Sequence, residues 1–244
     1  MYPYYGMGYG SGYGSSYLIY AVLMIVCFVF SLWAQASVSS AFRRFSKVTT
    51  RRGLTGRQAA ECVLRANNVT GIQFARIAGN LTDNFNPQTG IISLSNGVYD
   101  STSVASVGVA AHEAGHAVQH AVGYGPIRLR MAIIPLCSFG SRLSWPLLAI
   151  GLLVGITPLI GLGVAFFALS TLFQLVTLPV ELDASHRALK ALKEEGLLTA
   201  DELPMARKTL TAAAMTYLAA LATSVVQLLR LLAIYGNRRG GRRG

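Results

Sequence analysis

Three long stretches without charged residues dominate the pattern of hydrophobic and polar positions. Residues 17–36 are twenty uncharged positions, about the length of one bilayer-spanning helix. Residues 143–180 are 38 uncharged positions, enough for two spans, and residues 209–229 are a further 21 that favour helix. Glycine and proline interrupt the longest stretch at residues 155–158, where we expect the chain to turn. The pattern predicts three to four transmembrane helices.

One charged residue, Arg142, stands at the edge of the longest stretch. A span that started directly after it would be shorter than the roughly twenty residues that a bilayer needs. A span that started much earlier would bury the charge at a cost of about 2.5–3.5 kcal/mol. We therefore predict that this span starts around residues 135–137, with residues 131–134 forming a short interfacial link.

The segment between the first two hydrophobic stretches is polar and predicts a small α/β unit. Thr55 and Gln58 match a capping box for a helix that runs to about Asn67. Residues 71–78 predict a strand, and residues 80–95 predict a second strand, a turn and a third strand. The third strand either packs against the following helix or forms an edge that pairs with an extended peptide substrate. This candidate substrate-binding edge strand comprises Ile91, Ile92, Ser93, Leu94 and Ser95.

The next helix, predicted over residues 101–122, carries the chain's most distinctive polar cluster. The chain has only four histidines, and two of them, His112 and His116, flank Glu113 in an HExxH pattern. Positions i and i+4 share a helix face, so both imidazoles point toward one place, as a tetrahedral Zn²⁺ requires. Glu113 is close enough to act as general base on a water molecule without being a ligand.

A third protein ligand is expected, and few acidic residues are available. His120 lies on the same face but roughly 12 Å of helix rise beyond His112. The segment "LPVELDASHRALK" follows the long hydrophobic stretch and contains Glu181 and Asp183. A membrane hairpin would return this segment to the side of His116, so we expect Glu181 to be the third ligand and keep Asp183 as the alternative.

Composition and charge support membrane insertion and argue against nucleic-acid binding. The chain is 52% hydrophobic and 13% charged, against roughly a quarter charged in soluble domains. Most of the basic residues that give the chain its net charge of +11 flank the hydrophobic stretches. Because Lys and Arg that flank spans mark the cytoplasmic side, we expect the polar middle of the chain to lie in the cytoplasm. The basic tail "RRGGRR" would then lie on the opposite side, against this rule. Either the last helix does not cross fully, or the tail is tolerated there because the earlier spans dominate the orientation.

The stretch "LSNGVYDSTSVASVGVAAHEAGHAVQHA" together with "LPVELDASHRAL" resembles the bacterial neutral zinc metallopeptidases. More distantly, the chain is similar to the HtpX-like and CAAX-prenyl membrane metalloproteases. The resemblance implies zinc on His112, His116 and Glu181, with Glu113 as general base. The HtpX-like pattern has an Asp four residues after the ligand Glu, whereas this chain has Ser185 there and Asp183 two residues after. Which group orients the ligand histidines therefore stays open.

The predicted fold is a mainly α integral membrane protein, a gluzincin-like metalloprotease with a small β-sheet or hairpin beside the HExxH helix. The predicted parts are a Tyr/Gly-rich tail (1–16), a first transmembrane helix (17–40), a cytoplasmic zinc-protease subdomain (41–130), a transmembrane hairpin (131–180), a third-ligand helix with a connector (181–208), and a C-terminal apolar helix with a basic tail (209–244).

The predicted function is hydrolysis of peptide bonds by a zinc-dependent endopeptidase in a multi-pass plasma-membrane protein, with one Zn²⁺ per chain. Candidates for orienting the ligands or stabilising the oxyanion are Asp183, His186, Arg187 and Tyr99. We expect a peptide or membrane-protein substrate, contact with the lipid bilayer, no nucleic acid, and room for membrane-protein partners or an oligomer. The alternative is a zinc-binding membrane adaptor without proteolytic activity, although such a scaffold has no use for Glu113. A metal transporter is disfavoured because residues 143–180 contain no ionisable group.

Overall fold

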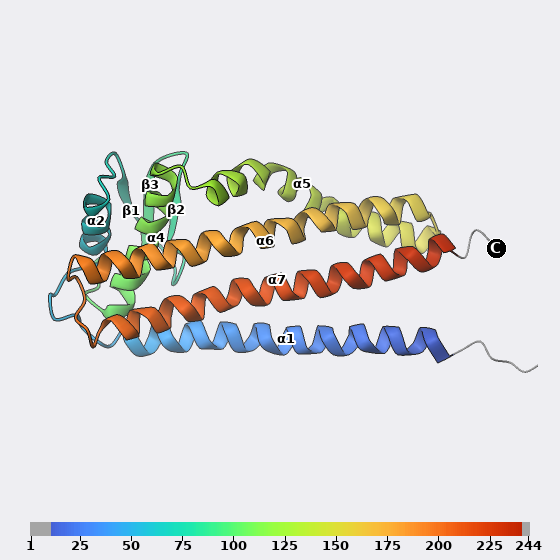
Figure 1. Ribbon diagram of the computed structural model, residues 1–244, viewed down its shortest axis with the longest axis horizontal. Coiled ribbons are helices and arrows are strands. Elements are labelled where there is room, and N and C mark those ends of the chain that lie inside the picture. The colour runs from blue at the N-terminus through green and yellow to red at the C-terminus, as the bar shows by residue number, and fades with distance from the viewer. Residues whose placement is uncertain (1–10, 241–244) are drawn as a thin grey trace, which may run out of the picture.

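Four long helices form an elongated bundle with a small α/β unit at one end (Figure 1). The computed structural model describes residues 11–240, so most of the predicted Tyr/Gly-rich tail lies outside the described residues. The long helices are α1 (Ser11–Phe45), α5 (Gly125–Val154), α6 (Thr157–Glu194) and α7 (Leu203–Gly240). Each is long and apolar enough to cross a membrane, which confirms the upper end of the predicted three to four spans.

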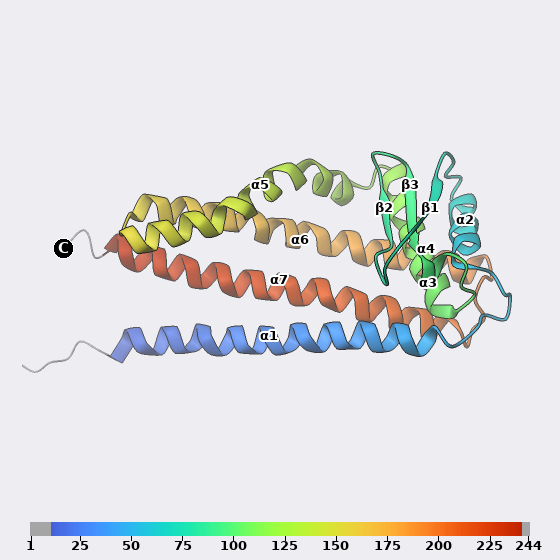
Figure 2. The ribbon, with the colours of Figure 1, turned by 180° about the vertical axis from the view of Figure 1, so that it is seen from behind.

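The four helices run alternately toward and away from the small unit. α1 leads toward it, α5 leads away, α6 returns, and α7 leads away again (Figures 1 and 2). The described ends of the chain therefore lie together at the far end of the bundle. There the Arg238 guanidinium donates to the Leu152 carbonyl, 3.4 Å away, near the end of α5. The C-terminal helix thus runs the full length of the bundle.

The hairpin of α5 and α6 turns where the sequence predicted. Gly155 ends α5 with a left-handed φ of 77°, and Pro158 stands in the first turn of α6. α5 is one helix from Gly125 onward, so residues 131–134 belong to it rather than forming a separate link. It bends along its length (Figure 2), and Pro135 and Pro146 inside it each remove a backbone hydrogen bond.

α6 is also continuous, from the far turn to the small unit. The predicted boundary between residues 180 and 181 therefore falls inside a helix rather than between two parts. The length of α6 explains this, because a helix of 38 residues extends well past the roughly twenty that a bilayer needs. The third-ligand segment is consequently held by the same rigid element as the second arm of the hairpin.

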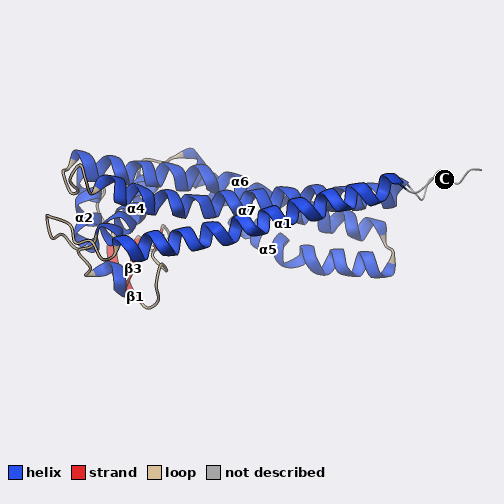
Figure 3. Ribbon diagram, turned by 90° about the horizontal axis from the view of Figure 1, so that it is seen from below, coloured by secondary structure: helices blue, strands red, loops and turns tan. Residues whose placement is uncertain are grey.

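The small unit contains α2 (Gly56–Ala66), the strands β1 (Gln73–Ile77), β2 (Asn84–Asn86) and β3 (Ile91–Ser95), the short α3 (Asn96–Tyr99) and α4 (Val104–Ala121). Strands occur only in this unit within the described part of the chain (Figure 3). The capping box of Thr55 and Gln58 is present at the start of α2. α4 begins later than predicted because Ser103 caps it, accepting a hydrogen bond from the Ser106 backbone N–H.

The prediction of an edge strand at residues 91–95 is wrong. The sheet order is β1-β3-β2, so Ile91, Ile92, Ser93, Leu94 and Ser95 form the central strand. β3 pairs in parallel with β1 and antiparallel with β2. The side chains of Ile92 and Leu94, which share one face of the strand, are fully buried, whereas Ile91 and Ser93 on the other face are partly buried. The parallel pairing joins strands distant in sequence, which the local pattern of residues does not reveal.

Candidate metal centre

Two helices bring three candidate zinc ligands together. His112 and His116 extend from α4, and Glu181 extends from α6. The Nε2 atoms of the two histidines lie 3.3 Å and 3.5 Å from the same oxygen of Glu181, Oε2. One potential ligand atom from each residue lies within 4.8 Å of the other two.

The donor set and its spacing fit a zinc ion. Ligand atoms at about 2.0–2.2 Å from a tetrahedral zinc lie roughly 3.3–3.5 Å from one another. The two measured separations from Glu181 match this range. Two imidazole nitrogens with one carboxylate oxygen also form a known ligand set of catalytic zinc sites, which leave a fourth position for water or substrate.

A cavity of about 230 Å³ lies beside this cluster, and His116 and Glu181 line it. The buried side chain of Glu113 lines the same cavity. Burial raises the pKa of Glu113, while the adjacent His112 and His116 act in the opposite direction. Burial alone would lower the pKa of His116, but its contact with the Glu181 carboxylate outweighs this and raises it. A carboxylate that is costly to keep charged accepts a proton readily, as a general base must.

A chain of polar contacts orients His116. Its Nδ1 lies 3.0 Å from Oε1 of Gln119, which is fully buried. The Gln119 amide donates to the Val180 carbonyl and to Asp183, each at 2.8 Å, and Arg187 donates to Asp183 at 2.6 Å. Because the amide nitrogen is used as a double donor, Oε1 is the acceptor, so Nδ1 of His116 carries the proton. Nε2 is then left with its lone pair for a metal.

Ser185 orients the other histidine. Its Oγ lies 3.1 Å from Nδ1 of His112. Ser185 is the residue that stands where the HtpX-like pattern has an Asp, so the departure from that pattern replaces a carboxylate by a hydroxyl. Asp183, the alternative ligand, lies outside the three-residue cluster and contacts Gln119 and Arg187 instead.

Two further polar residues face the cavity, and the sequence did not single them out. Arg130 of α5 donates to Oε1 of Glu181 at 3.0 Å, leaving Oε2 toward the histidines. Tyr217 of α7 lines the same cavity. The position of Arg130 just before a long hydrophobic stretch was a visible signal, but Tyr217 lies within an apolar helix with nothing local to mark it.

Of the four residues predicted to orient the ligands or stabilise the oxyanion, three that could donate to an oxyanion are absent from the lining of this cavity: His186, Arg187 and Tyr99. His186 lines a different cavity, between α6 and α7. Arg187 pairs with Asp183 and lies over the ring of Tyr124. The Tyr99 hydroxyl accepts a hydrogen bond from Arg57 at 3.3 Å, and its ring lies beneath Arg76.

The strand that borders the cavity is β2. Asn84 and Phe85 of β2, together with Asp83 before it and Pro87 after it, form one wall. β2 is an edge of the sheet, since it pairs only with β3 within the described structure. Asp83 fixes this wall to the sheet by accepting hydrogen bonds from the Ser95 backbone and side chain, at 2.7 Å and 3.2 Å. Burial raises the pKa of Asp83, although both bonds oppose the change.

Comparison with known proteins relates the chain to zinc metallopeptidases. Residues 20–236 match the family described as "Putative neutral zinc metallopeptidase". The chain is 39% identical over 222 residues to "Putative membrane protease YugP" of Bacillus subtilis (strain 168). That alignment covers 91% of this chain and 99% of the relative. No solved structure matches the chain.

Proposed function

Because the chain belongs to the family of neutral zinc metallopeptidases, we propose that it is a membrane endopeptidase whose metal centre is His112, His116 and Glu181. The observation that carries the proposal is the convergence of both histidine Nε2 atoms on one oxygen of Glu181, with Glu113 lining the same cavity. A zinc ion bound there would supply Lewis acidity, which acidifies water and polarises the scissile carbonyl.

Glu113 acts as the general base. Its buried carboxylate accepts a proton from the attacking water and then delivers that proton to the leaving amine. Gln119 holds His116 in the tautomer that leaves Nε2 free, and Ser185 contacts Nδ1 of His112, the ring nitrogen that does not face Glu181. Arg130 donates to Oε1 of Glu181, the oxygen that does not face the histidines, and so fixes the rotation of that carboxylate.

Tyr217 is the best-placed donor to the carbonyl oxygen of the substrate. A tetrahedral intermediate develops negative charge on that oxygen, and a fixed donor stabilises it more than it stabilises the ground state. Tyr217 lines the cavity beside Glu181, and the Arg130 guanidinium donates to Oε1 of the same carboxylate. This assignment replaces His186, Arg187 and Tyr99 as the proposed oxyanion stabiliser.

The substrate lies extended along β2. An edge strand offers unpaired backbone groups to a peptide, and β2 forms the cavity wall. Across the cavity, α5 presents the apolar side chains of Ile127, Met131 and Ile134. An apolar side chain next to the scissile bond fits this wall, which favours hydrophobic peptides or unfolded segments of membrane proteins as substrates.

The small unit faces the cytoplasm in this proposal. Basic residues gather at its end of all four long helices: Arg43, Arg44, Lys47, Arg128, Arg130, Arg187, Lys190, Lys193, Arg207 and Lys208. Arginine and lysine that flank spans mark the cytoplasmic side. The basic residues Arg238 and Arg239 at the opposite end oppose the rule but are outnumbered.

The decisive test compares detergent-purified protein with its Glu113→Gln variant. The variant removes the base but no ligand, so we expect full zinc content and loss of casein cleavage. The same comparison distinguishes a peptidase from a zinc-binding adaptor, because an adaptor needs no general base. If the variant cleaves casein as fast as the original protein at equal zinc content, Glu113 is not the base and the proposed mechanism is wrong.

A further inference from the structure

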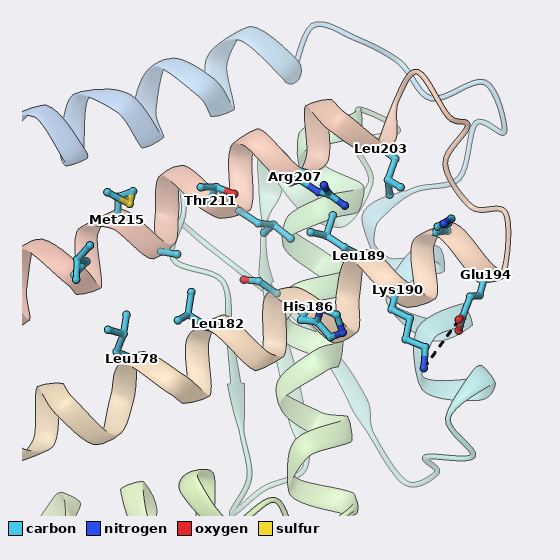
Figure 4. A pocket seen from close by; sticks show the side chains of 15 residues that line it. Leu178, Leu182, His186, Leu189, Lys190, Glu194, Leu203, Arg207, Thr211 and Met215 are labelled. Carbon is cyan, nitrogen blue, oxygen red and sulfur yellow. Dashed lines mark ion pairs between the residues drawn. The ribbon is translucent and has the colours of Figure 1, made fainter.

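A second and larger cavity lies between α6 and α7, with a volume of about 710 Å³ (Figure 4). We call it the α6–α7 groove. Its lining comes from both helices: Leu178, Leu182, Ser185, His186, Leu189, Lys190, Lys193 and Glu194 of α6, and Leu203, Arg207, Leu210, Thr211, Ala214, Met215 and Leu218 of α7. It is distinct from the cavity that contains Glu113, and the proposed peptidase mechanism does not use it.

The groove changes character along its length. Its far end is apolar, with Leu178 and Met215 on opposing helices (Figure 4). Its end near the small unit is basic, with Lys190, Lys193 and Arg207. The antiparallel course of α6 and α7 produces this gradient, because it sets the start of one helix beside the end of the other. Within the lining, Glu194 is the one acidic residue, and it stands 4.0 Å from Lys190.

The length of the groove matches one leaflet of a bilayer. Twelve residues separate Leu178 from Lys190, which corresponds to about 18 Å of helix rise. Half of a hydrocarbon core is about 15 Å thick. An acyl chain along the apolar part therefore ends at the level of the basic residues, where a lipid phosphate would lie.

We propose that the α6–α7 groove binds one anionic phospholipid from the leaflet on the side of the small unit. Lys190, Lys193 and Arg207 bind the phosphate headgroup, and an acyl chain lies against Leu178, Leu182 and Leu218. Charge complementarity selects this occupant. A transmembrane helix of a partner protein would fill the apolar part but would leave the basic end without a counter-charge.

Ser185 connects the groove to the metal centre. It lines the groove, and its hydroxyl also contacts Nδ1 of His112. A lipid seated in the groove therefore packs on the turn of α6 that orients one of the candidate ligands. The lipid proposal does not depend on proteolysis, since lipid binding is measurable in a protein that cleaves nothing.

Native mass spectrometry of the full-length protein tests the proposal. The detergent-solubilised protein is titrated with phosphatidylglycerol, with phosphatidylcholine of the same chains, and with inorganic phosphate. We expect one retained phosphatidylglycerol per chain, weaker phosphatidylcholine and no retained phosphate. A Lys190→Gln, Lys193→Gln, Arg207→Gln variant should bind phosphatidylglycerol about fivefold more weakly for each charge removed, from roughly 1 kcal/mol per basic residue at a membrane surface.

A matched control removes three charges at the same end of the molecule but outside the groove: Arg43→Gln, Lys47→Gln and Arg65→Gln. It should keep the affinity of the original protein. Ala214→Trp fills the apolar part and should lower the affinity without changing any charge. Equal binding of both phospholipids, an equal loss in the control, unchanged binding in Ala214→Trp, or retention of inorganic phosphate in place of lipid would each overturn the proposal.

Discussion

Gly115 of α4 lies directly against the backbone of Ala184 in α6. A Cβ atom at Gly115 would stand 2.6 Å from the Ala184 carbonyl oxygen, closer than real Cβ atoms approach other atoms. Gly115 lies within the HExxH pattern, and Ala184 is three residues from Glu181. The contact therefore sets the distance between the helix that carries the histidines and the helix that carries the glutamate.

Gly115→Ala should separate these helices and weaken zinc binding. The added methyl group meets backbone rather than a flexible side chain, so α6 must move, and overpacking of this kind costs about 1–3 kcal/mol. We expect a lower melting temperature and a lower zinc content after dialysis against a weak chelator. The matched control is Gly108→Ala in the same helix, where the new Cβ would lie an acceptable 3.4 Å from the Ala206 Cβ. Equal zinc content in both variants would contradict this role of Gly115.

Gln119→Leu should lower zinc affinity by about 10–100-fold, the usual effect of removing a group that orients a metal-bound histidine. The substitution keeps the volume of the side chain but removes the contact with His116 and the donor to Asp183. Competition with a fluorescent zinc chelator measures the affinity. His120→Gln is the control, since His120 lies in the same helix but is exposed and packs against Phe85. An affinity that falls as far in the control would show that the effect is not specific to Gln119.

The pair of histidines was predictable because their relation is local: the helical repeat alone puts positions i and i+4 on one face. Glu181 was predictable at lower precision, because a membrane hairpin must return the chain to the same side. Ser185, Arg130 and Tyr217 were not, since their roles depend on how α5, α6 and α7 rotate about their axes. Gln119 lies three residues after His116 on the same helix, but its bonds to Val180 and Asp183 depend on the position of α6. The prediction that residues 91–95 form an edge strand failed for a related reason. β1 and β3 pair in parallel although β2 lies between them in the sequence, and no local pattern encodes that pairing.

Glu181→Ala should reduce zinc content more than Asp183→Ala. The Glu181→Ala variant loses a direct ligand oxygen. Asp183, in contrast, acts on His116 only through Gln119. We expect near-complete loss of zinc in the first variant and partial loss in the second, measured by elemental analysis of purified protein. The opposite ranking would make Asp183 the third ligand and would contradict the ligand set proposed here.

Tyr217→Phe should lower kcat by about 10²–10³-fold while leaving zinc content unchanged, as expected when one oxyanion donor is removed. The variant removes the hydroxyl of a residue that lines the cavity and keeps its ring. Tyr99→Phe is the matched control, because its hydroxyl contacts Arg57 outside the cavity. Steady-state cleavage of a quenched fluorescent peptide separates kcat from KM. If kcat fell in Tyr99→Phe but not in Tyr217→Phe, Tyr217 would not be the oxyanion donor.

The orientation in the membrane is open to a direct test, because the two ends of the bundle carry different exposed positions. Arg65 is exposed in α2, within the small unit, and Ile156 is exposed in the turn between α5 and α6 at the far end. Single cysteines at these positions can be compared after Cys27, Cys62 and Cys137, all free thiols, are replaced by alanine. An impermeant maleimide should label Arg65→Cys in inverted vesicles and Ile156→Cys in intact spheroplasts. A third variant, Arg142→Cys, tests the predicted span start around residues 135–137, which requires labelling from the cytoplasmic side alone. In the structure, Cys137 and Ser144 contact Leu169 and Gly163 of α6, farther from Lys190 than Leu178 is, so the placement of the α6–α7 groove in the leaflet on the side of the small unit requires the opposite result. Labelling of Arg65→Cys only from the periplasmic side would invert the topology, and the proposed cytoplasmic active site would be wrong.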